Sequence, residues 1–131
     1  MNASGKGLVL FAHGARDPRW AQPFERLAEL VRSNVPDTVV ALGFLELMTP
    51  RLPELVRDMV AQGVGEIAVV PVFLGQGGHV LRDLPVLAEA ARAAHPGLVF
   101  NVAQAVGEDA DVLAAMMAYC VKVAHGNTSA G

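Results

Sequence analysis

The sequence is poor in cysteine and in aromatic residues, and it has no long apolar run. Cys120 is the single cysteine of the 131 residues, so no disulfide can form within the chain. Aromatic residues make up 5% and hydrophobic residues 53%, which predicts an aliphatic core. No run approaches the roughly 20 apolar residues of a membrane helix, and no leader of the secretory type is recognisable. We therefore expect a soluble protein of the reducing cytoplasm with no membrane partner.

Charge is also scarce. The formal net charge is −3, and no cluster of Lys or Arg alternates with aromatic residues, which argues against a nucleic-acid surface. A small ligand or a protein partner is the better expectation. The length fits one domain over residues 1–131, with a disordered tail from about residue 126.

Apolar runs typical of strands alternate four times with patterns typical of helices. The run from Ile67 to Leu74 is apolar at every position, which predicts a parallel strand covered on both faces. Asp17-Pro18 and Thr49-Pro50 each resemble a cap followed by proline at a helix start. Predicted strands cover 7–12, 38–45, 67–74 and 98–103, and predicted helices cover 17–33, 50–62, 81–94 and the segment from 107 onward.

This alternation predicts an α/β fold, a single four-stranded parallel sheet with helices on both faces. We expect the strand order 2-1-3-4, in which the winding reverses between strands 1 and 3. Such sheets bind ligands in the crevice outside the carboxyl ends of the strands at that reversal. His13 follows strand 1, His79 follows strand 3, and Glu46 follows strand 2. The sequence therefore predicts a ligand site that contains both histidines.

Other candidate residues have simpler interpretations. Glu46 by itself could be paired, exposed or poised for proton transfer. His95 lies in a helix stop and His125 in the tail, so both are expected to be structural or solvated. A stripe at helical spacing near the carboxyl end predicts a face packed on the core rather than a metal site. Its members are Leu113, Met116, Met117 and Cys120.

The loop at residues 75–78 has almost no side chains, so a ligand could approach its backbone closely. It lacks the Lys-Ser/Thr of a phosphate loop and the spacing of a dinucleotide fingerprint, which makes a flavodoxin-like nucleotide module a weak alternative. Arginines also gather at the predicted crevice and would suit a polycarboxylate or phosphate ligand, unless they are merely solvated. They are Arg16, Arg19, Arg51 and Arg82.

Four motifs carry a resemblance to a known family. They are the HG-x-x-D-P run at His13 to Pro18, the FLE-x-x-x-P run at Phe44 to Pro50, the long run from Pro71 to Pro85 and VGED at Val106 to Asp109. Over about residues 7–123 the chain is similar to the short sirohydrochlorin cobaltochelatases, the single-domain members of the class II chelatase family. Ala15 departs from the serine that is common in that family after His-Gly.

The resemblance implies a chelatase half-fold and a set of site residues. His13 and His79 would bind the incoming metal, His13 would also accept a proton, and Glu46 would assist as the third catalytic residue. The chemistry is consistent, because neutral imidazole suits Co²⁺, Fe²⁺ and Ni²⁺ and can accept protons near neutral pH. The residues expected to meet the substrate are Gly14, Arg16, Glu46, Gly75, Gln76, Gly77, Gly78 and Arg82.

The expected function is insertion of a divalent metal, Co²⁺ first, into sirohydrochlorin in cobalamin biosynthesis. Fe²⁺ insertion for sirohaem and a non-catalytic metal or tetrapyrrole carrier are the alternatives. The metal is a substrate, and no permanently bound cofactor is expected.

We also expect a homodimer, because one unit supplies one wall of a pocket for a large macrocycle. Trp20, Leu47 and Met48 are candidates for the contact between copies, unless they pack beneath the first two helices.

Overall fold

The computed structural model describes residues 5–75 and 77–126, and for residues 78–81 it describes the backbone alone. A four-stranded parallel sheet of order β2-β1-β3-β4 forms its centre, which confirms the predicted order. The strands are β1 Gly5–Ala12, β2 Thr38–Phe44, β3 Val64–Pro71 and β4 Val99–Val102. The helices are α1 Gln22–Asn34, α2 Leu52–Ala61, α3 Gly78–Ala94 and α4 Ala110–Ala124, with short 3₁₀ segments η1 Pro18–Ala21 and η2 Val106–Glu108.

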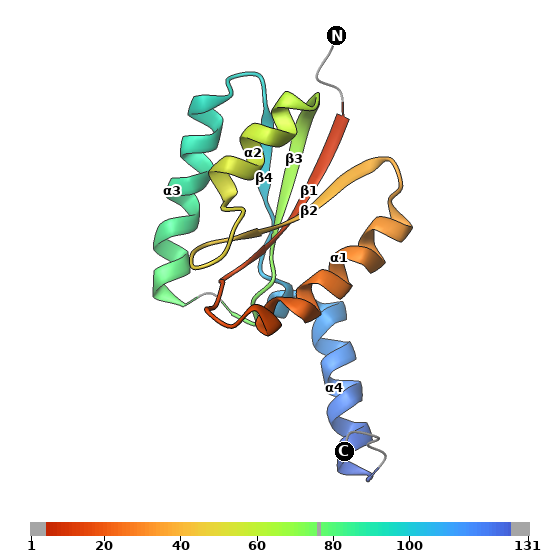
Figure 1. Cartoon of the computed structure of the whole chain (residues 1–131). Coiled ribbons are helices and arrows are strands. Elements are labelled where there is room, and N and C mark those ends of the chain that lie inside the picture. Colours follow the sequence, from red (N-terminus) through yellow and green to blue (C-terminus); the bar gives the residue numbers. More distant parts are fainter. Residues whose placement is uncertain (1–4, 76, 127–131) are drawn as a thin grey trace.

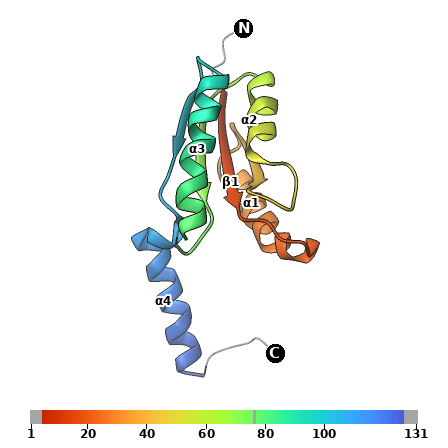
Figure 2. The same cartoon turned by 90° about the vertical axis from the view of Figure 1, so that its left-hand side faces the viewer.

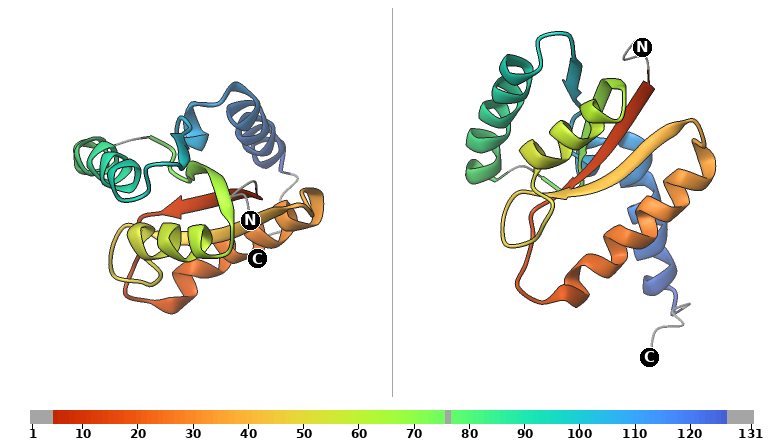
Figure 3. Two further views of the ribbon diagram at one scale, coloured as in Figure 1. Left: turned by 90° about the horizontal axis from the view of Figure 1, so that it is seen from above. Right: turned by 45° about the horizontal axis from the view of Figure 1, so that its top comes forward.

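Helices α2 and α3 lie on one side of the sheet and α1 on the other (Figures 1 and 3). The main core lies between the sheet and the α2–α3 pair, and it is aliphatic except for two phenylalanines. Its fully buried members include Val9, Phe11, Leu52, Val56, Met59, Ile67 and Val69. A smaller cluster forms under α1, where Ala28 packs on Leu10 and Val40.

The prediction that strand 67–74 is covered on both faces is wrong. β3 starts at Val64 and ends at Pro71, and its buried residues alternate with half-buried ones. Ile67 and Val69 are buried, whereas Ala68 and Val70 are half-buried because α1 covers mainly β1 and β2 on their side of the sheet.

The last helix does not pack on the core, contrary to the prediction for its apolar stripe. α4 has no buried residue, and it extends away from the body past the edge at which the strands end (Figures 1 and 2). Met117 is 58% exposed. The stripe at 113, 116, 117 and 120 is therefore an exposed apolar face in the single chain.

Two helix starts differ from the prediction. Arg51, not Thr49, is the cap residue of α2, and its backbone N–H donates to a Glu54 carboxylate oxygen at 3.0 Å. α3 starts at Gly78 rather than near residue 81, so Pro85 lies inside the helix, beyond the first turn where it was expected. At η1 the prediction is confirmed, since the Asp17 side chain accepts from the Arg19 backbone N–H.

Two arginines tie helix ends to the outer strands. Arg32 at the end of α1 donates from Nε to the Val40 carbonyl of β2 at 3.1 Å. Arg92 near the end of α3 donates from Nε and Nη2 to the Phe100 carbonyl of β4 at 3.1 and 2.9 Å. In both cases one arginine side chain links a helix by hydrogen bonds to the strand that follows it in the sequence.

Within residues 5–75 and 77–126, no helix is long and apolar enough to cross a membrane.

Candidate functional site

The backbones of strands β1 and β2 remain paired beyond their ends. Leu45 N–H donates to the Ala12 carbonyl at 2.9 Å, and Glu46 N–H donates to the His13 carbonyl at 3.1 Å. This extension places His13, the first residue after β1, and Glu46, the second residue after β2, at the same edge of the sheet. His13 and Glu46 are thereby neighbours at the carboxyl end, as the strand order predicts.

The two side chains approach each other closely. The Nε2 atom of His13 lies 3.6 Å from the Oε2 atom of Glu46, which is longer than a hydrogen bond but within ion-pair range if the imidazole is protonated. Their side chains are 42% and 43% exposed, so solvent and a ligand can reach both. The ring of Phe73 meets the imidazole edge to face, at 6.5 Å between centroids. The pair is therefore open on one side and bordered by an apolar ring on another.

Gly14 makes this arrangement possible. Its φ is +104°, in the region that favours glycine. A Cβ at this position would collide with the carbonyl oxygen of Glu46. Gly14 thus has a structural role between the two loops, and its predicted contact with substrate remains a prediction.

The loop after β3 leads to the second histidine. Val72 N–H donates to the Phe11 carbonyl at 2.8 Å, which holds the start of the loop at the β1 end. Gly75 and Gly77 are exposed, and a Cβ atom added at either position would have no other atom within 4 Å. The backbone there is therefore open to a ligand. Gly77 is the cap residue of α3, and His79 lies in its first turn. The side chain of His79 and the whole of Gln76 lie outside the described residues, and so do the side chains of Val80 and Leu81.

In the part of the chain that the structure describes, this edge included, no group of three or more His, Cys, Asp or Glu side chains could hold a metal. His13 and Glu46 together offer one imidazole nitrogen and a carboxylate. A divalent ion held by two such groups keeps several open positions, which suits an ion in transit rather than a permanent one.

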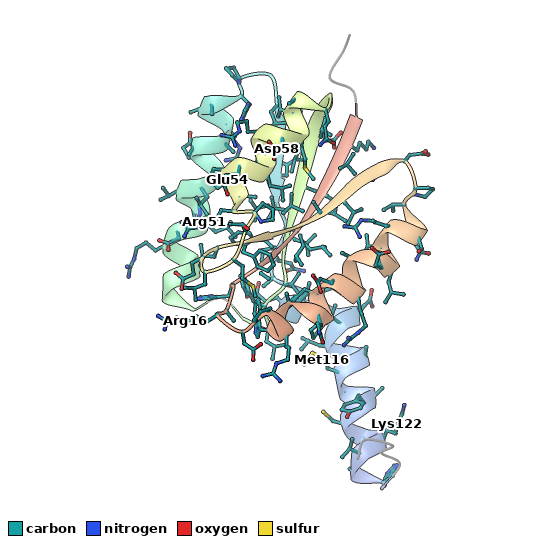
Figure 4. The ribbon with its side chains drawn as sticks, in the orientation of Figure 1. Arg16, Arg51, Glu54, Asp58, Met116 and Lys122 are labelled. Carbon is teal, nitrogen blue, oxygen red and sulfur yellow. The ribbon has the colours of Figure 1, made fainter. Side chains whose placement is uncertain are left out.

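A cavity of about 440 Å³ lies beside this edge, between the starts of α2 and α3. Arg51 and Arg82 line it together with the Asp83 side chain and apolar residues. Arg16 is exposed on the loop that follows His13 (Figure 4). These three guanidinium groups therefore lie around the strand-end edge, as predicted.

Arg19, the fourth predicted arginine, has a different role. Its Nη2 donates to the Asp17 Oδ2 atom at 2.7 Å. The hydrogen bonds from the Arg19 side chain and then from its backbone N–H hold the pKa of Asp17 below its ordinary value. Arg19 thus stabilises the start of η1 rather than facing the crevice.

Phe73 and Asp83 were not selected from the sequence as site residues. Both lie in the long motif at 71–85, but an aromatic after a strand and an acid on a helix are each usually structural. Their position beside His13 and in the arginine-lined cavity becomes apparent only in three dimensions.

Comparisons with known proteins agree on one family. The sequence profile of the CbiX family matches residues 7–122. A sirohydrochlorin cobaltochelatase of Methanopyrus kandleri is 42% identical over 78 residues, 60% of this chain and 54% of that protein. The corresponding protein of Methanocaldococcus jannaschii is 39% identical over 80 residues, 61% of this chain and 56% of that protein. This chain therefore matches little more than half the length of these relatives.

Solved structures give matches that span nearly the whole chain. A proposed cobalamin (vitamin B12) biosynthesis CbiX protein from Marinobacter aquaeolei VT8 has a TM-score of 0.80 and 32% identity, over 94% of this chain and 99% of that one. The sirohydrochlorin chelatase SirB from Bacillus subtilis subspecies spizizenii, in complex with cobalt, has a TM-score of 0.78 and 25% identity. The match covers 92% of this chain and 51% of SirB.

Proposed function

Because this chain belongs to the CbiX family, we propose that it inserts a divalent metal, Co²⁺ foremost, into sirohydrochlorin for cobalamin synthesis in the cytoplasm. The observation that carries the proposal is the His13–Glu46 pair at the strand-end edge, 3.6 Å apart and open to solvent. The single, exposed Cys120 suits a reducing compartment.

The reaction requires three tasks of the protein. It must strip water from the metal ion, remove two pyrrole N–H protons, and hold a polyanionic ring. His13 and His79 would bind the ion through neutral imidazole nitrogens and leave the remaining positions open to the ring nitrogens. Two donors bind weakly enough that the four-nitrogen ring can take the ion from them.

The His13–Glu46 pair can also remove the pyrrole protons of the ring. Once the ion passes to the ring, the His13 Nε2 atom is free of metal and can accept a pyrrole proton. Glu46 stabilises the imidazolium that results, because its carboxylate lies within ion-pair range. Both groups are solvent-accessible, so the proton can then leave to water. The second pyrrole proton can follow the same route after the first is lost.

Ring binding would use the arginine groups. Guanidinium groups pair carboxylates in bidentate fashion, and sirohydrochlorin carries several of them. Arg82 and Arg16 would hold carboxylates at the edge, and the backbone at residues 75–78 would lie against the flat ring. Among the described groups, Arg51 and Arg82 share the 440 Å³ cavity, which supports a carboxylate site there.

We also propose that the working form is a homodimer. The chain matches 51% of SirB, so a second copy could supply what the remainder of that longer chain supplies. A macrocycle needs a second wall, because ligand sites bury most of the ligand surface.

The test is anaerobic mixing of the protein with sirohydrochlorin and Co²⁺, Fe²⁺ or Ni²⁺, with the absorbance of the ring followed in time. Acceleration over the uncatalysed rate, greatest with Co²⁺, is the expected result. A preference for Fe²⁺ would assign the protein to sirohaem synthesis instead. Binding of ring and metal without acceleration would make it a carrier and would overturn the proposal.

A further inference from the structure

Leu47 has a backbone conformation that leucine rarely adopts. Its φ is +67°, and among the residues that the structure describes it is the one residue other than glycine with a positive φ. In this left-handed region the Cβ atom crowds a backbone carbonyl oxygen, so glycine is the usual residue and asparagine the next. A leucine at this position strains the folded chain. The benefit of its side chain has to be found in its surroundings.

Packing inside the chain does not supply that benefit. Leu47 is 52% exposed and belongs to none of the apolar clusters that the described residues form. The apolar residues on either side of it in the same loop are anchored. Leu45 packs against the main core, and Met48 packs against the cluster that contains Phe44. Leu47 is thus the apolar residue of this loop that points away from the protein.

The backbone on both sides of Leu47 is fixed. Glu46 N–H, directly before it, donates to the His13 carbonyl at 3.1 Å. At the base of the loop, Phe44 N–H donates to the Pro50 carbonyl at 3.0 Å. The loop therefore presents the Leu47 side chain in a defined place, next to the carboxylate that approaches His13.

A second exposed leucine lies on the other side of His13. β1 runs between β2 and β3, so the loops after β2 and β3 border the residue that follows β1. Leu74, in the loop after β3, is 68% exposed. Gly107 N–H donates to the Phe73 carbonyl at 2.9 Å, and a Cβ atom added at Gly107 would collide with the Leu74 carbonyl. Leu74, like Leu47, thus has a fixed backbone and directly follows a residue that meets His13.

We infer that Leu47 and Leu74 bind the flat face of the tetrapyrrole ring on the two sides of His13. Neighbouring strands are about 4.8 Å apart, so the loops after β2 and β3 are separated by roughly 10 Å, a span that a large flat ring covers. The carboxylates of sirohydrochlorin lie on the rim of the ring, whereas its face gains from apolar contact. In this arrangement the arginine groups recognise the rim, and the two leucines recognise the ring itself.

The position of Leu47 favours a ligand over another protein surface as the group that covers it. Consecutive Cα atoms are about 3.8 Å apart, so a protein surface packed on Leu47 would also press on Glu46. His13 and Glu46 are 42% and 43% exposed, and the proposed reaction requires that a ring reach them. A ring that brings its centre to this pair has to lie over the loops beside it. The inference rests on the proposed function for the identity of that ring.

The test measures binding of metal-free sirohydrochlorin to the full-length protein, by anaerobic titration of the ring absorbance with no metal ion present. Leu47→Asn keeps a residue that tolerates the left-handed region but removes the apolar surface. We expect its Kd for the ring to be higher by about 10-fold or more, and its Tm to be no lower than that of the wild type. Leu47→Met keeps the apolar surface and should bind the ring as the wild type does.

Two further variants complete this test. Leu30→Ala removes a leucine that is 66% exposed on α1, and as the control it should leave the Kd unchanged. Leu74→Ala should raise the Kd by several-fold. Because the two leucines belong to different loops, the fold-changes should multiply in the Leu47→Asn, Leu74→Ala double variant. A double variant no weaker than Leu47→Asn alone would overturn the contact on two sides.

Three outcomes would contradict the role of Leu47. Wild-type affinity of Leu47→Asn for the ring would exclude the contact. A clear fall in Tm with Leu47→Asn would make the side chain a part of the fold. Weaker association of copies without the ring, measured by sedimentation, would assign Leu47 to a contact between chains. Ring binding that depends on Leu47 without accelerated metallation would instead defeat the proposed function and leave this inference in place.

Discussion

Gly14 and the backbone of Glu46 are in direct contact, and no larger residue fits between the loops that they occupy. Gly14→Ala therefore has to displace the β2 end loop or change a φ of +104°. We expect a loss of about 2 kcal/mol or more in the free energy of unfolding, measured by urea titration. Gly97→Ala is the control, because a Cβ atom added at Gly97 would have no other atom within 4 Å. It should change stability by less than about 1 kcal/mol. Equal effects of both substitutions would show that the contact is unimportant.

Removal of either histidine that we propose as a metal ligand is expected to abolish catalysed metallation while the fold remains. His13→Ala and His79→Ala should each lower the rate by about 100-fold or more, because a single imidazole holds the ion too weakly. Both should also weaken Co²⁺ binding by the protein alone, followed by titration calorimetry. His95→Ala, at the end of α3, is the matched control and should have wild-type activity. Wild-type activity of His79→Ala would remove that residue from the mechanism.

The rate of metallation should depend on pH. Metal binding requires neutral imidazole, so protons compete with the ion for the same nitrogen atoms. We expect the rate to fall as the pH decreases from about 8 to about 5, measured with protein that remains folded by circular dichroism. A flat profile over this range would exclude titrating imidazoles from the reaction.

Arg82 is expected to bind a substrate carboxylate in the cavity that it shares with Arg51. Arg82→Ala should raise the KM for sirohydrochlorin by about 10-fold and change kcat much less, since it removes one charge-assisted contact. The salt dependence of KM should decrease in the variant. Arg57→Ala, an exposed arginine of α2 outside this cavity, should leave KM unchanged. A fall in kcat alone would place Arg82 in the chemical step.

Asp17 should give a small acid-dependent contribution to stability. Arg19 holds the pKa of Asp17 below its ordinary value of 3.8, so the carboxylate stabilises the folded state above that pH, and the contribution is lost as the pH falls through the lower folded value. Asp17→Asn should therefore lower the Tm near neutral pH, and the difference from wild type should vanish in strong acid. A difference that is constant with pH would indicate a hydrogen-bonding effect alone.

The sequence predicted the sheet and the neighbourhood of His13 and Glu46 because both follow from local pattern and topology. Four strand-helix alternations permit few strand orders, and the carboxyl ends of neighbouring parallel strands meet by necessity. The 3.6 Å approach of the two side chains, in contrast, depends on the backbone pairing beyond the strands. That pairing requires Gly14, whose structural role is not readable from its neighbours.

The position of α4 could not be predicted in the same way. The spacing of Leu113, Met116, Met117 and Cys120 indicates that the helix has a face to bury, but not which chain covers it. The turn that directs α4 outward is set by Gly107 against Leu74, a contact between segments more than 30 positions apart in the sequence.

Trp20, a candidate for the contact between copies, instead packs inside its own chain. It lies on Phe24 and Phe44, with ring centroids 4.5 and 6.4 Å away. Met48 joins the same cluster, whereas Leu47 is 52% exposed.

Arg32 and Arg92 have a consequence for how the protein avoids aggregation. β2 and β4 are the outer strands, and by the alternation of a parallel strand the carbonyls of Val40 and Phe100 point outward from the sheet, since Leu45 and Ala103 donate inward. Outward carbonyls on an edge are templates for an added strand from another chain. Each arginine occupies one of them. Growth of the sheet by strand addition is thus discouraged at both borders, and contacts between copies are left to helices and sheet faces.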